Sequence, residues 1–134
     1  MFTTTRLLRF GDCDPSGIAY FPAYLDMLVG VVEEFFAATA IAWPDMIRIN
    51  RIGTPTLTLG VTFLHPGVHG DNLTFFLKIL RVGRSSLDLL HEVRHDIQPL
   101  WRAEQRLVAT SLDTHKSIPW PDEIRAALTK YAEH

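Results

Sequence analysis

A stretch of apolar residues from Ala23 to about Ala40 is the feature that most restricts how this chain can fold. Its apolar positions recur at three- and four-residue spacing, which is the pattern of one side of a helix. These positions are Leu25, Leu28, Val29, Val32, Phe35 and Phe36. Val31, Ala37 and Ala38 fill much of the opposite side, so we expect another layer of the protein to cover the helix.

Runs of strand length lie on both sides of this helix in the sequence. They occupy residues 2–10 before it and, after it, residues 56–65, 73–79, 87–94 and 101–114. The first three runs after the helix alternate apolar with polar residues, as half-buried strands do. The last alternates less cleanly, and we interpret it as a strand because Val108, Thr110 and Leu112 favour one. A curved antiparallel sheet of about five strands around one long helix, an α+β fold, is the compact arrangement for this order.

The remaining segments complete a single domain of residues 1–134, with a core at 1–114 and a tail at 115–134. We expect Trp43-Pro44 to end the helix and residues 41–54 to be irregular. Gly30, in the middle of the helix, predicts that another backbone packs closely there. Residues 121–132 can form a short closing helix. In residues 56–65, the expected apolar face consists of Leu57, Leu59, Val61 and Phe63.

Charge and cysteine content narrow the possible partners and compartment. The chain has 13 basic and 15 acidic residues, a net charge of −2, so nothing indicates nucleic-acid binding. Its single cysteine, Cys13, excludes an internal disulfide and fits a reducing compartment. The N-terminus lacks the pattern of a signal peptide, and no apolar stretch is long enough to span a membrane. We expect a cytoplasmic protein without a membrane partner.

The segment before the helix carries the residues with chemical potential. It reads Gly11-Asp12-Cys13-Asp14-Pro15, and Pro22 occupies the first turn of the helix, where its missing N–H costs nothing. A helix N-terminus presents unpaired amides and partial positive charge, and can stabilise an oxyanion. A carboxylate held beside it could attack a carbonyl or activate water. This pairing indicates acyl chemistry.

Asp14 is the candidate for the catalytic carboxylate, because Pro15 fixes it on the loop that leads into the helix. The alternative is an Asx turn, in which Asp14 binds the amide of Ser16 or Gly17. We expect Asp12 to cap or orient the loop, and we expect no metal, because an Asp-x-Asp pair supplies too few oxygens. Cys13 is interpreted as a small packed residue and not as a nucleophile.

The run from Phe10 to Ile18, followed by Tyr20-Phe21-Pro22-Ala23-Tyr24-Leu25, resembles the opening of the 4-hydroxybenzoyl-CoA thioesterases, which are hotdog-fold acyl-CoA thioesterases. The resemblance extends over roughly residues 4–114. It includes Gly53-Thr54-Pro55, His65-Pro66, Gly70-Asp71 and Gly83-Arg84-Ser85-Ser86. It implies a hotdog fold and a homo-oligomer, a dimer or a dimer of dimers (homotetramer), with sites between subunits.

The resemblance also implies roles for individual residues. Asp14 would be nucleophile or general base, the backbone N–H of Phe21 would polarise the thioester carbonyl, and Gly17 would allow close approach of the acyl group. The acyl pocket would draw on Tyr20, Tyr24, Leu25, Val29 and Thr54. The hydroxybenzoyl enzymes place a carboxylate where this chain has Val29. That difference favours a benzoyl, another aryl or a short aliphatic group, unless Asp26 supplies the contact.

Coenzyme A ends in phosphates, for which Arg84, Ser85 and Ser86, with Arg81 nearby, are the best local candidates. The alternative is an ordinary hairpin turn with solvated arginines. No cofactor is expected, because coenzyme A belongs to the substrate. The sequence therefore predicts an aryl-CoA thioesterase. The alternatives are a short-chain acyl-CoA or acyl-carrier-protein thioesterase of the same fold, and a non-catalytic acyl-CoA-binding domain.

Overall fold

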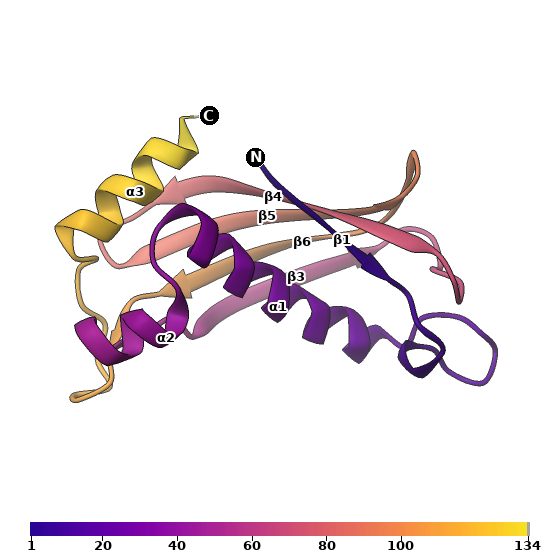
Figure 1. Cartoon of the computed structure of the whole chain (residues 1–134), viewed down its shortest axis with the longest axis horizontal. Helices are drawn as coiled ribbons and strands as arrows, with labels where there is room; N and C mark the ends of the chain where they lie inside the picture. The colour runs from indigo at the N-terminus through magenta and orange to yellow at the C-terminus, as the bar shows by residue number, and fades with distance from the viewer. Residues whose placement is uncertain (134) are drawn as a thin grey trace.

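A five-stranded antiparallel sheet with one long helix along its face forms the centre of the protein (Figure 1). The computed structural model describes residues 1–133. The order of strands in the sheet is β1-β4-β5-β6-β3. Their bounds are β1 Phe2–Leu7, β3 Thr56–Phe63, β4 Asn72–Val82, β5 Ser86–His95 and β6 Gln98–Val108. The long helix α1 spans Phe21–Thr39, so the predicted α+β arrangement is confirmed.

Shorter elements and loops lie at the two ends of the sheet. At one end lie α2, a π-helix, and the closing helix α3, whereas the loop before α1 lies at the opposite end (Figure 1). A small second sheet pairs β2 with β7. The bounds are 3₁₀ helix Phe10–Asp12, α2 Trp43–Asp45, π-helix Met46–Asn50, β2 Ile52–Gly53, β7 Thr110–Ser111 and α3 Asp122–Ala132. The predicted closing helix is thus present.

The hydrophobic core lies between α1 and the facing side of the sheet. From the helix it takes Tyr24, Leu28, Val31, Val32, Phe35 and Phe36. From the sheet it takes, among others, Leu73, Phe75, Leu77, Leu87, Leu89, Val93, Trp101, Ala103 and Leu107. The predicted tail contributes as well, since Trp120, Ile124 and Leu128 are buried against this core.

Several expectations about the helix are wrong in detail. It ends at Thr39, and Trp43-Pro44 instead begins α2, where proline fits the first turn. Residues 41–54 are therefore not wholly irregular. At Gly30 the near neighbour is the guanidinium of Arg6, 3.7 Å from the position a Cβ would take, and not another backbone. Val31 is buried, whereas Val29, Ala37 and Ala38 face outward, because within one chain the sheet covers one side of α1 only.

Edge strand β3 differs from the expected half-buried strand. A bulge at Leu57 interrupts its pairing with β6, so that Thr56 lies opposite Leu107 and Thr58 opposite Arg106. Leu57 therefore leaves the face that carries Leu59, Val61 and Phe63. Apart from half-buried Val61, the strand is exposed along its length in the single chain.

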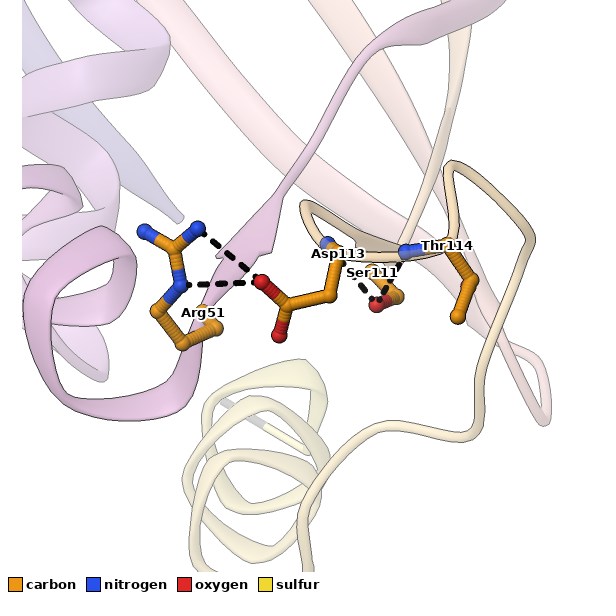
Figure 2. A network of polar contacts seen from close by, with 4 residues as sticks. All are labelled: Arg51, Ser111, Asp113 and Thr114. Atoms are coloured by element: carbon orange, nitrogen blue, oxygen red, sulfur yellow. Dashed lines mark hydrogen bonds and ion pairs between the residues drawn. The ribbon is translucent and has the colours of Figure 1, made fainter.

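The last predicted strand is also interrupted. β6 ends at Val108, and the chain then leaves the main sheet to pair β7 with β2. An ion pair holds this corner, in which Arg51 Nη2 lies 3.0 Å from Asp113 Oδ1 (Figure 2). The amides of Asp113 and Thr114 donate to the Ser111 hydroxyl oxygen at 3.2 Å (Figure 2). These contacts stabilise the turn after β7 at the end of the sheet opposite the loop that precedes α1.

Candidate active site

The loop of residues 9–20, called the Asp14 loop below, is folded by its own hydrogen bonds. Asp12 accepts a hydrogen bond from the Arg9 amide at 3.0 Å, which confirms that it orients the loop. Gly17 has a φ of 82°, a left-handed conformation that favours glycine, and its amide donates to Asp14 O. The Asp14 amide donates to Ile18 O at 2.9 Å. These bonds turn the chain back on itself around Asp14.

The Asp14 carboxylate is held in one orientation by Ser16. Oδ1 accepts hydrogen bonds from the Ser16 amide at 2.9 Å and from the Ser16 hydroxyl. These bonds to the ionised form, with a smaller contribution from the backbone of Ile18, lower the pKa of Asp14 below its ordinary value. Among the hydrogen bonds of residues 1–133, none involves Oδ2. The Asx turn is therefore present and still leaves one carboxylate oxygen available for chemistry.

A second loop, residues 64–71, supports the Asp14 loop and is called the support loop. The Ala19 amide donates to Gly67 O at 2.9 Å, and the His69 amide donates to Gly17 O at 3.0 Å. Between them, Ile18 and Val68 form an antiparallel bridge. The support loop comes directly after β3, so the edge strand and the Asp14 loop meet at the same end of the molecule.

Helix α1 begins at Phe21, directly after the Asp14 loop, with Pro22 in its first turn. The first amide of a helix has no partner within the helix, and no hydrogen bond from the Phe21 amide to another part of residues 1–133 is found. The helix dipole adds partial positive charge at this point. The Phe21 N–H is thus available to an external acceptor.

A cavity of about 410 Å³, called the Asp14 cavity, opens where these elements meet. Its wall combines one carboxylate with a cluster of aromatic rings. The rings of Phe21 and Phe63 are 6.1 Å apart, and those of Tyr24 and Phe63 are 6.4 Å apart. The lining residues are Asp14, Ile18, Ala19, Tyr20, Phe21, Tyr24, Phe63, Leu64, His65, Pro66 and Gly67.

Four of the predicted site residues line this cavity, namely Asp14, Tyr20, Phe21 and Tyr24. Gly17 does not line it and instead shapes the Asp14 loop. Leu25 and Val29 also lie outside its lining, and Val29 is exposed on the outward face of α1. Within one chain, the predicted acyl pocket is therefore only partly assembled.

The predicted coenzyme A residues are not brought to this cavity within one chain. Gly83, Arg84 and Ser85 connect β4 to β5 at the α3 end of the sheet, and the Trp120 indole donates to Ser86 O at 3.0 Å. Strand β4 separates this hairpin from the Asp14 end by roughly 30 Å at the usual rise of a strand. Thr54, just before β3, also lies at the α3 end. Arg81 follows the bulge that shifts the β4–β5 register after Ile79.

Sequence reasoning missed the contribution of the β3 end to the cavity. Phe63, Leu64, Pro66 and Gly67 form one wall, and His65 joins them with its Nδ1 3.2 Å from Pro99 O. The only signal was the turn His65-Pro66 after a strand, which gives no indication that this turn meets a loop about fifty residues earlier in the chain. That contact depends on the sheet topology.

Cys13 lies in the Asp14 loop but is not suited to be a nucleophile. Its Sγ lies 3.6 Å from Arg9 O, and the side chain is half-buried. Burial, followed by the negative charges of Asp12 and Asp14, raises the pKa of its thiol. At neutral pH the thiol therefore stays protonated, in agreement with the interpretation of Cys13 as a packed residue.

A model of the thioesterase-like superfamily matches residues 8–128. The chain belongs to this superfamily. Membership in this superfamily, together with the relatives described below, confirms the hotdog fold and the thioester hydrolase class predicted from the sequence. In the part of the chain that the structure describes, no helix is both long and apolar enough to cross a membrane. The cytoplasmic location stays a prediction.

Relatives of the thioesterase act on aromatic acyl-CoA compounds. It is 28% identical over 123 residues to a 1,4-dihydroxy-2-naphthoyl-CoA hydrolase of Nostoc punctiforme, covering 92% of this chain and 83% of that protein. It is 28% identical over 110 residues to the 4-hydroxybenzoyl-CoA thioesterase of a Pseudomonas species, covering 77% of this chain and 78% of that protein. The resemblance to the 4-hydroxybenzoyl-CoA thioesterases is thereby confirmed.

Solved structures agree with this placement. A mutant of 4-hydroxybenzoyl-CoA thioesterase in complex with 4-hydroxybenzoyl-CoA matches with a TM-score of 0.88 at 25% identity, covering 95% of this chain and 97% of that one. A 1,4-dihydroxy-2-naphthoyl-CoA thioesterase from Synechocystis also matches with a TM-score of 0.88, at 24% identity, covering 99% and 98%. The second match supports the fold alone.

Proposed function

We propose that this acyl-CoA thioesterase hydrolyses an aryl-CoA to a carboxylic acid and free coenzyme A, with Asp14 as its catalytic carboxylate. The observation that carries the proposal is the shared position of Asp14 and Phe21 on one aromatic-lined cavity. An ionised carboxylate and a helix N-terminus are the two groups that acyl transfer requires, a nucleophile or base and an electrophilic stabiliser.

The substrate carbonyl oxygen accepts a hydrogen bond from the Phe21 amide, where negative charge develops as the thioester is attacked. In one route, the free oxygen of Asp14 attacks the carbonyl carbon, the C–S bond breaks, and the thiolate of coenzyme A leaves. Water then hydrolyses the resulting anhydride. In the other route, Asp14 removes a proton from a water molecule that attacks the same carbon. Both routes need Asp14 ionised, as its lowered pKa ensures near neutral pH.

An aromatic acyl group fits the chemistry of the cavity wall. The rings of Tyr20, Phe21, Tyr24 and Phe63 offer edges and faces to an aryl group. The two groups of relatives are named for substrates with a hydroxylated aryl group, either hydroxybenzoyl-CoA or dihydroxynaphthoyl-CoA. Because Val29 replaces the carboxylate of the hydroxybenzoyl enzymes, we favour an aryl group without a 4-hydroxyl anchored at that position.

The complete site requires a second copy of the chain. Strand β3 is the sheet edge next to the Asp14 cavity, and its backbone edge has no partner among residues 1–133. Antiparallel pairing of two β3 strands would bring Thr54 and the coenzyme A residues Arg84, Ser85 and Ser86 of the partner towards the Phe63 end of the first chain. A homodimer, or a dimer of dimers, would thus join the two parts that one chain keeps apart.

The test is thiol release from benzoyl-, 4-hydroxybenzoyl-, phenylacetyl-, short-chain and long-chain acyl-CoA, with Asp14→Asn beside the wild type. We expect aryl-CoA turnover that falls on the order of a hundredfold or more in the variant, without loss of fold or coenzyme A binding. Turnover of short-chain esters or of an acyl carrier protein alone would replace the aryl assignment. Saturable binding without thiol release would indicate a binding domain, and normal rates in Asp14→Asn would contradict the role of Asp14.

A further inference from the structure

Asp71 lies outside the Asp14 cavity but is connected to Asp14 by a short series of hydrogen bonds. It closes the support loop just before β4 begins, and its side chain is largely buried, with 21% exposed. Its Oδ2 accepts a hydrogen bond from the Val68 amide at 2.9 Å, and its own amide donates to Val68 O at 3.0 Å. Asp71 therefore fixes both backbone polar groups of Val68.

Val68 lies at the centre of the contact between the support loop and the Asp14 loop. It forms the bridge with Ile18, and the hydrogen bonds of Gly67 and His69 to the Asp14 loop lie on either side of it. Ile18 O accepts the Asp14 amide at 2.9 Å. The connection from the Asp71 carboxylate to the Asp14 backbone thus runs through the Val68 amide, the hydrogen bond between Gly67 and Ala19, and the hydrogen bond between Ile18 and Asp14. Only its first step involves a side chain.

The other contacts of Asp71 anchor it to the sheet. Asp71 O accepts the Leu8 amide at 2.8 Å, and Leu8 is fully buried. Oδ1 lies 3.5 Å from His95 Nε2 on β5. One oxygen of the carboxylate therefore binds the support loop while the other faces His95 on β5. The position of the support loop thus depends on the position of the sheet.

From this geometry we propose that Asp71 is a positioning residue for the Asp14 carboxylate, acting through the Val68 amide. The inference rests on the proposed role of Asp14. Displacement of a catalytic group by about 1 Å can reduce turnover on the order of a hundredfold. Two backbone hydrogen bonds join the Asp14 loop to the support loop, so a shift of the support loop should displace Asp14. Asp71 does not line the Asp14 cavity, so its effect on Asp14 is exerted through the support loop.

Three single variants separate the hydrogen bond from the charge. Asp71→Ala removes the acceptor for the Val68 amide, and we expect kcat to fall roughly tenfold or more with KM little changed. Asp71→Asn keeps a carbonyl oxygen in the same place and should restore most of kcat. Asp96→Asn is the matched control, because Asp96 Oδ2 also lies near His95, at 3.7 Å, but accepts no support-loop amide. Its kcat should equal that of the wild type.

Two further measurements exclude a merely structural effect. In the Asp14→Asn background, Asp71→Ala should lower kcat no further, because the two residues act as one unit. Hydrogen exchange should accelerate at the amides of Asp14 and Ala19 in Asp71→Ala but not in Asp71→Asn. Unchanged kcat in Asp71→Ala, equal loss in Asp71→Asn, or unchanged exchange would each overturn the proposal.

The outcomes also separate this proposal from the proposed function. If Asp14→Asn retains full activity, the catalytic assignment fails, whereas the exchange measurement still shows whether Asp71 holds the Asp14 loop. If Asp14→Asn is inactive and Asp71→Ala is fully active, the positioning role alone fails.

Discussion

Gly67 is the point at which a single methyl group should disturb the contact between the support loop and α1. A Cβ built on Gly67 would lie 2.2 Å from the Tyr24 hydroxyl oxygen and 3.1 Å from Leu8 Cδ2. All three residues are buried. The φ of Gly67 is outside the left-handed region, so alanine can adopt its backbone conformation. The cost of Gly67→Ala is therefore steric and arises mainly at Tyr24.

The magnitude follows from this geometry. Overpacking of a filled core costs about 1–3 kcal/mol, and alanine returns roughly 0.4–1 kcal/mol by restricting the unfolded chain. The net loss of about 1–2 kcal/mol should lower Tm by roughly 4–8 °C in a domain of this size. Tyr24→Phe removes the hydroxyl that the methyl group meets. That hydroxyl is buried with no hydrogen-bond partner of normal geometry in residues 1–133, so its loss alone should cost little.

The assay is thermal unfolding of the wild type, both single variants and the double variant at one protein concentration, because association shifts Tm. We expect the double variant to recover most of the stability that Gly67→Ala loses, which is a coupling of about 1 kcal/mol between the two positions. A Gly67→Ala variant as stable as the wild type, or a double variant that shows only the sum of the single effects, would contradict a steric cost at Tyr24.

Three further predictions follow from other contacts. Ser16→Ala removes the hydroxyl that does most to lower the pKa of Asp14, so the acidic limb of kcat/KM should move to higher pH, and an unmoved limb would contradict the role of either residue. Burial lowers the pKa of His91 to about 4, so its contribution to stability is complete above about pH 6.5 and is lost as the pH falls towards 4. The glutamine of His91→Gln can still bond to Gln105. Between pH 6.5 and 4, the free energy of unfolding in urea should fall by roughly 3 kcal/mol less in this variant than in the wild type, and equal losses would contradict this. Lysine at both Leu57 and Leu59 should block pairing of edge strand β3, giving a monomer by light scattering with little thioesterase activity; an active monomer would show that one chain suffices.

The local signals in the sequence determined much of the site before any contact was known. Pro22 and the apolar spacing placed the start of α1 to within one or two residues, and Gly17 marked the turn of the Asp14 loop. The Asx turn at Asp14 could be predicted because it depends only on residues two positions apart. Alternation located the strands for the same reason, since side chains on a strand repeat every two residues.

Tertiary structure alone decided the features that depend on distant pairing. The bulge at Leu57 shifts the register of β3 against β6 by one residue, and the alternation of residues within β3 does not predict that shift. The aromatic wall from Phe63 to Gly67 meets the Asp14 loop only because β3 is the sheet edge and its end turns back towards α1. Arg84 and Thr54 resemble site residues in sequence, yet the length of the strands keeps them at the other end of the sheet from Asp14. Local propensity specifies elements, whereas the position of a site depends on which elements the core brings together.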